Sequence, residues 1–213
     1  YERSEFANND DVVTVVAPVG ATPAQNQLSP DNEYSQIAWN AGISMGKTSR
    51  LHLSLLKGTR EQDEQFLPYS LGSNFADLVL PQQSLDGEVD ITHYNVKFTT
   101  RPIAKLNLLA RYTYDERDSN TDSVGYAPVR FDARTYSDGP RVNPAYSLES
   151  EKLELQASYR LPGRIKLTVG YDDLSKKRNI AEVETVDETM PWARIKWAPV
   201  PGLNFSLKYE DSD

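Results

Sequence analysis

The sequence predicts an all-β protein: an antiparallel, up-and-down transmembrane β-barrel of the porin type, in which this chain forms a multi-hairpin segment of a larger barrel. Three observations lead to this prediction. Apolar and polar residues alternate along every candidate strand, short turns join strands at one end, and long polar connections join them at the other. This combination is typical of bacterial outer-membrane barrels, whose periplasmic turns are short and whose extracellular loops are long.

A hairpin unit that recurs four times defines the short turns. Turns near residues 46–50, 101–105, 161–164 and 199–202 are followed at once by the strand sequences LHLSLLKG, LNLLARYTY, IKLTVGY and LNFSLKY. Each turn is also preceded by an alternating strand. We therefore expect all of these turns at the periplasmic rim of the barrel.

The long connections lie at the other end of the hairpins, near residues 7–31, 60–86 and 117–147, and are expected as extracellular loops. The first follows a strand end at residues 1–6 and holds an apolar patch, VVTVVAPV, that suits a short loop strand. The third is dense in Asp, Ser, Asn, Gly and Pro, which favour turns at a wet surface. A shorter link, KKRNIAEVET, joins the last two hairpins.

The alternation gives each strand an apolar and a polar face, because neighbouring side chains in a strand point to opposite sides. In the first two hairpins the apolar face holds Ile37, Trp39, Ala41, Ile43 and Met45; Leu51, Leu53 and Leu55; Tyr94, Val96 and Phe98; Leu106, Leu108, Ala110, Tyr112 and Tyr114. In the last two it holds Leu153, Leu155, Ala157, Tyr159 and Leu161; Ile165, Leu167, Val169 and Tyr171; Ala193, Ile195 and Trp197; Leu203, Phe205, Leu207 and Tyr209. The third strand is expected at residues 91–100 and the sixth at 165–172.

The composition excludes several classes of protein. The 213 residues are 38% hydrophobic and contain no apolar run of eighteen, which excludes a transmembrane helix but not a barrel. Cysteine is absent, so this chain offers no disulfide, thiolate metal site or covalent haem attachment. A net charge of -8 disfavours nucleic acid as a partner, since phosphate binding needs a basic surface.

The two ends of the chain indicate a segment. The sequence opens on a strand end, shows no signal peptide in YERSEFANND, and closes on another strand, KYEDSD. We therefore expect an export signal upstream and further strands to close the sheet, although eight or nine strands are in principle enough to close alone.

Aromatic residues near both ends of the strands are expected to form the belts that mark a membrane interface. The distance from Leu106 to Tyr114 is about 26 Å along the strand, or roughly 20 Å of height at a tilt of about 40°, close to the expected apolar band of about 25 Å. Ordinary packing in a β-sandwich is the alternative, but the predicted strands are longer than is usual there. The expected belt residues are Trp39, Tyr94, Phe98, Tyr112, Tyr114, Tyr159, Tyr171, Trp197 and Tyr209.

The polar face is the candidate functional surface, because it would line the barrel lumen. Its bulky charges suit either a water-filled channel or a surface complementary to a protein lodged inside, and the sequence leaves both readings open. The candidate partner contacts are Lys97, Arg101, Arg111, Lys152, Glu154, Lys166, Arg194, Lys196 and Lys208, with Asp172 and Glu210 on the same face.

No catalytic, cofactor-binding or metal-binding residue is predicted in this chain, which we do not expect to be an enzyme. The two histidines, His52 and His93, lie on predicted polar faces and are expected as wetted lumen residues rather than metal or haem ligands. The acidic segment at residues 115–122, DERDSNTD, offers oxygen ligands for Ca²⁺ but lacks the Gly and distal Glu of an EF-hand loop. It is expected as a solvated loop, as is EQDEQ at residues 61–65. Gly20 and Gly125 stand alone in loops and form no phosphate-binding motif.

From about residue 91 to 213, the chain resembles the MtrB/PioB family of outer-membrane barrels associated with decahaem cytochromes. The stretches that carry the resemblance are NVKFTTRPIAKLNLLARYTYDERDSNTD, NPAYSLESEKLELQASYRLPGRIKLTVGYDDLSKKR and EVETVDETMPWARIKWAPVPGLNFSLKYEDSD. Their shared features are the Thr-Thr-Arg-Pro turn, the tyrosine-rich strand exit, the Glu-Thr…Trp strand entry and the Pro-x-x-Gly-Leu turn.

The resemblance implies a porin-like sheath in the bacterial outer membrane. Such a barrel embeds and insulates a periplasmic decahaem cytochrome, and an extracellular multihaem cytochrome docks at the long-loop side. Electrons then cross the membrane from haem to haem, in metal reduction or iron oxidation. The resemblance implies no cofactor in this chain, with haem c held by the partner cytochromes. A passive or substrate-specific diffusion porin and a surface β-sandwich with binding loops are the alternatives.

Overall fold

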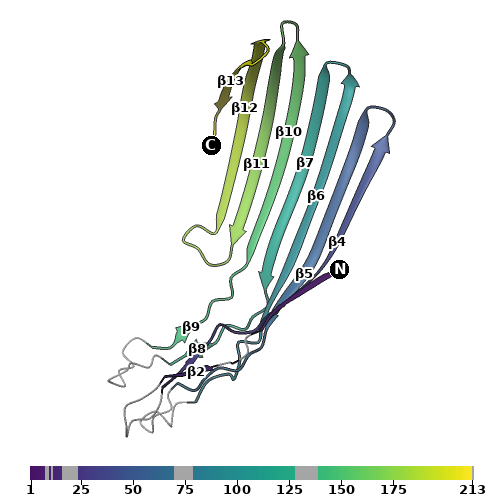
Figure 1. The fold of residues 1–213 in the computed structure, drawn as a ribbon. Helices are drawn as coiled ribbons and strands as arrows, with labels where there is room; N and C mark the ends of the chain where they lie inside the picture. Colours follow the sequence, from purple (N-terminus) through teal and green to yellow (C-terminus); the bar gives the residue numbers. More distant parts are fainter. Residues whose placement is uncertain (8–9, 11, 16–23, 70–78, 128–138, 213) are drawn as a thin grey trace. The chain divides into compact units, whose positions relative to one another are not determined.

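The computed structural model describes residues 1–7, 10, 12–15, 24–69, 79–127 and 139–212, and every regular element in these residues is a β-strand (Figure 1). The predicted all-β class is therefore confirmed. Gly20 and parts of the three long connections lie outside the described residues.

The main sheet has nine strands in an open order that follows the chain, with β1 and β13 at its edges. Its strands are β1 (Glu2–Phe6), β4 (Asn32–Met45), β5 (Ser49–Gln62), β6 (Gly87–Ile103), β7 (Leu106–Ser119), β10 (Leu148–Leu161), β11 (Ile165–Arg178), β12 (Thr185–Val200) and β13 (Leu203–Glu210). This neighbour-to-neighbour order is the up-and-down topology that the repeated hairpins predict.

The chain forms two compact units. Unit 1 comprises Tyr1–Gln36, Gly58–Asp90 and Asp118–Tyr146. Unit 2 comprises Ile37–Lys57, Ile91–Arg117 and Ser147–Asp213, and it contains all the short turns and the whole of β10 to β13.

Unit 1 holds the short strands of the long connections. The apolar patch predicted as a loop strand is β2 (Val12–Val15), which pairs with β3 (Ala24–Gln27). A second small ladder joins β8 (Gly125–Tyr126) to β9 (Arg141–Val142). The sequence did not predict β3, β8 or β9. β8 and β9 have only two residues each, and β3 (AQNQ) has no apolar alternation.

The short turns of unit 2 occupy residues 46–48, 104–105, 162–164 and 201–202, at the same end of the sheet in Figure 1. Glycines take the left-handed backbone conformation that three of these turns require, with φ of 69° at Gly46, 76° at Gly163 and 86° at Gly202. The Pro201–Gly202 pair has the residue order of a type II turn. Placement of these turns on the periplasmic side stays a prediction.

Several strands extend farther than the alternation predicts. The third predicted strand is β6, which begins at Gly87, and the sixth is β11, which continues to Arg178. Within the predicted KKRNIAEVET link, only residues 179–184 lie outside strands, because Lys177 pairs with Thr185. In β6 and β11 the extensions are mostly polar, apart from Val89 and Leu174, so ladder hydrogen bonds form there without an apolar alternation to reveal them.

The burial pattern is that of a single-layered sheet. Among the described residues no apolar side chain is fully buried, and the buried side chains are the polar Ser158 and Thr168, 1% and 7% exposed. A sandwich would bury its apolar face against a second sheet. Here the apolar face stays open, with Ile195 47% exposed.

Candidate functional site

The strand register of unit 2 separates two faces. Tyr159 lies opposite both Leu106 and Leu167, and Leu167 lies opposite Ile195, so these side chains share what we call the apolar face. One residue along, Ser158 lies opposite both Asn107 and Thr168, which places these side chains on the polar face. The strands thus pair apolar with apolar and polar with polar across several ladders.

The apolar face ends in carboxylates on the side away from the short turns. Glu151 lies opposite Tyr114, and Asp173 opposite Leu153. The Tyr112 hydroxyl donates a hydrogen bond of 2.8 Å to Glu151, and the Tyr171 hydroxyl donates one of 3.2 Å to Asp173. A phenol with an apolar ring and a hydrogen-bonded hydroxyl suits the boundary between hydrocarbon and water.

The remaining predicted belt residues also occupy apolar-face positions. Tyr94 stacks on Tyr114 with ring centroids 4.6 Å apart, and Trp197 stacks on Phe205 at 5.5 Å. Trp39 and Tyr209 are exposed, at 54% and 69%. Phe98 and Tyr159 belong to the same belt. Contact of the belt with lipid stays a prediction.

The middle of the polar face is a charge-balanced network. Glu154 accepts a hydrogen bond of 2.9 Å from Arg111 and one of 3.1 Å from Lys152, so the structure brings three predicted site residues together. Two further pairs bridge β6 and β7: His93 with Asp115, at 2.6 Å between Nδ1 and Oδ1, and Asn95 with Thr113, at 2.7 Å.

The short-turn end of the polar face is basic instead. Lys166 lies directly opposite both Arg160 and Lys196, and Arg194 lies directly opposite Lys208. We call these five side chains the basic band. The sequence predicted all of them as site residues except Arg160.

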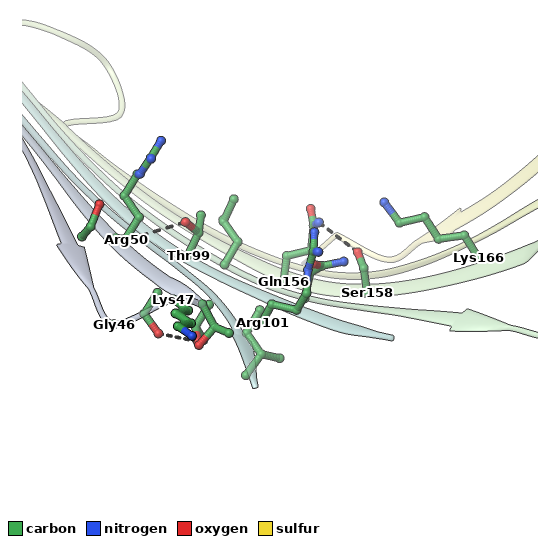
Figure 2. Close-up of a pocket in the computed structure, with 15 residues that line it drawn as sticks. Gly46, Lys47, Arg50, Thr99, Arg101, Gln156, Ser158 and Lys166 are labelled. Atoms are coloured by element: carbon green, nitrogen blue, oxygen red, sulfur yellow. Dashed lines mark hydrogen bonds between the residues drawn. The ribbon is translucent and has the colours of Figure 1, made fainter. Parts of the chain in front are cut away.

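A polar hollow of about 610 Å³ lies at this end, and Figure 2 shows it. The Arg50, Gln156, Ser158 and Lys166 side chains rise from the same side of the curved sheet in that view. Arg101 also lines the hollow and donates a hydrogen bond of 3.0 Å to Asn107. Lysine, arginine, amide and hydroxyl groups line this space together with Leu108 and Leu109, and none of the described residues that line it carries a carboxylate.

Trp192 is a polar-face residue that the sequence analysis did not single out as a site. It lies opposite Gly170, with the Arg194 guanidinium 5.3 Å and the Lys208 ammonium 5.7 Å from its ring centroid. The feature of the sequence that could have identified it is an aromatic residue at a position that the alternation assigns to the polar face. Lys97 occupies the polar face of β6 and forms no ion pair within the described residues.

The structure gives the metal candidates no support. No group of three or more His, Asp or Glu side chains in the described residues is arranged to hold a metal ion. In the DERDSNTD segment, Asp115 pairs with His93, and the Asn120 amide donates hydrogen bonds to Glu88 and Asp90. The first five residues of that segment belong to β7, so the prediction of a solvated loop was wrong there. Within the residues that the structure describes, no helix is long and apolar enough to cross a membrane.

Comparison with known proteins gives two findings. The whole chain, residues 1–213, matches the family described as outer membrane beta-barrel porin, MtrB/PioB. A relative, the outer membrane protein MtrB of Shewanella baltica (strain OS185), is 29% identical over 169 residues. The match covers 79% of this chain but only 23% of the relative, so the chain spans a minor part of that protein's length.

Proposed function

Since this chain belongs to the MtrB/PioB family of outer-membrane β-barrel porins, we propose that it forms part of a sheath around a periplasmic decahaem c-type cytochrome. The barrel embeds and insulates the cytochrome, and an extracellular multihaem cytochrome docks at the long-loop side. Electrons cross the outer membrane through the haems, in metal reduction or iron oxidation. The barrel itself holds no cofactor and catalyses no reaction.

The observation that carries this proposal is the contrast between the two faces of unit 2. The apolar face leaves Leu, Ile, Val and aromatic side chains open, as a lipid-facing wall requires. The polar face presents long charged side chains and a broad polar hollow. Such a surface can contact an inserted protein by many hydrogen bonds and ion pairs while the wall excludes lipid.

The visible spectrum of the purified protein tests the proposal. The full-length protein that contains this segment is expressed with its native partners and extracted from outer membranes in mild detergent. We expect a co-purifying c-type haem Soret band in a fixed ratio to the barrel. A colourless preparation that conducts ions in planar bilayers would instead identify a diffusion porin, the second candidate.

The polar hollow is the observation that keeps the diffusion porin as a candidate, because a wetted polar wall also suits a channel. Heat-modifiable migration on a gel separates either barrel from a surface sandwich. A barrel migrates differently before and after boiling, whereas a full-length protein that stays soluble without detergent would contradict both barrel functions.

A further inference from the structure

The basic band opposes like charges across adjacent strands. Arg160, Lys166 and Lys196 occupy directly opposed positions on β10, β11 and β12. Side chains in such positions lie about 5 Å apart at Cβ, and like charges there destabilise a sheet. The arrangement therefore costs stability in the free barrel, and an external anion would relieve the repulsion.

The chain supplies little charge compensation of its own. Within the described residues, Arg160, Lys166 and Lys196 form no ion pair, and Lys208 pairs with Glu210. The network farther along the same face does pair its cations, as in Arg111 with Glu154. A chain with a net charge of -8 has thus gathered uncompensated cations at one end of one face.

The position of the band indicates the kind of anion. These side chains lie on the polar face, opposite to the open apolar face, so lipid phosphates at the outer surface of a barrel would not reach them. The adjacent hollow of about 610 Å³ adds Arg50 and Arg101 as further cations among neutral amide and hydroxyl groups. Several cations spread over six strands match an extended acidic surface better than a single small anion.

We propose that the basic band is an electrostatic docking site for a carboxylate-rich surface of the protein that occupies the lumen, at the short-turn end of the barrel. The inference rests on the proposed function and adds which part of the wall binds the occupant and by which chemistry. Asp and Glu side chains of the occupant accept hydrogen bonds from the lysine and arginine groups, and the contact orients the occupant as it enters. Exposed charge pairs of this kind weaken with salt.

The test uses the full-length protein with the double substitution Lys166→Gln and Lys196→Gln. Removal of the repulsion should leave assembly, read by heat-modifiable migration, at least as good as in the wild type. The ratio of haem to barrel after detergent purification should nevertheless fall roughly tenfold at 0.3 M NaCl. The double substitution to Arg, which keeps both charges, should retain the wild-type ratio.

The matched control is Lys176→Gln, on the same strand and the same face but at the far end from the short turns. It should leave the haem ratio unchanged at every salt concentration. The inference alone is overturned if the double Gln variant assembles and keeps the wild-type ratio over the whole salt range. It is also overturned if Lys176→Gln loses as much haem. A colourless wild-type barrel would overturn the proposed function, and the docking site with it.

Discussion

The Trp192 indole lies directly over Gly170 on the polar face, so closely that a Cβ built on Gly170 would come within 2.3 Å of the ring. Gly170 therefore provides the space in which Trp192 packs. Arg194 and Lys208 lie against the same ring. This packing fixes the position of two cations of the basic band.

Substitution of Gly170 by Ala should destabilise the barrel by about 1–3 kcal/mol, because the added methyl group displaces the indole. The free energy of unfolding in lipid vesicles, from urea titration of Trp fluorescence, measures the loss. Gly42→Ala is the control: it lies on the same face and a Cβ there meets no atom within 4 Å. Equal losses in the two variants would refute the packing role of Gly170.

Arginine in place of Leu167 should impair assembly by about 2–4 kcal/mol if the residue lies near the bilayer midplane. Leu167 lies between Tyr159 and Ile195 on the apolar face. Lys166→Gln, one residue away on the polar face, should assemble normally. The yield of heat-modifiable barrel compares the two, and equal tolerance would contradict the assignment of faces.

The Arg111–Glu154 pair should show a coupling energy of about 0.5–3 kcal/mol in a double-mutant cycle with Arg111→Met and Glu154→Gln. Its side chains are only 35% and 23% exposed, and Lys152 also contacts Glu154. The Lys177–Glu149 pair, where Lys177 is 56% exposed, is the comparison and should give a smaller coupling energy, because solvent screens an exposed ion pair. Unfolding titrations provide both cycles, and the reverse order would be inconsistent with the network.

Stability should depend on pH through Lys177 at the long-loop end. The hydrogen bond and the charge of Glu149 raise the pKa of Lys177 above its ordinary value of 10.5. A raised pKa means that the folded state holds the proton more tightly, so the contribution is present below pH 10.5 and is lost as pH rises through the folded value. The stability difference between wild type and Lys177→Gln should shrink over that range. A difference that grows there would contradict this sign.

Alternation predicted the fold class, the four hairpins and the faces of the long strands, because a period of two residues directly records which side meets an apolar environment. It did not predict the ends of β6 and β11, where most residues are polar and no apolar alternation marks the strand. It also could not show that Lys166 opposes Arg160 and Lys196, since opposition depends on register between strands. The Gly170–Trp192 contact could not be predicted from the sequence either, because it also depends on the register between strands.

Thiol accessibility on the two faces tests most directly whether the polar face encloses a protein. This 213-residue segment has no cysteine, so Ser150→Cys on the polar face and Ala157→Cys on the apolar face introduce its only thiols. With a membrane-impermeant maleimide and barrels embedded in lipid, we expect Ser150→Cys to react in barrels made without the cytochrome and to be protected in haem-containing ones. Ala157→Cys should stay unreactive in both. Equal labelling of Ser150→Cys with and without the cytochrome would contradict the account.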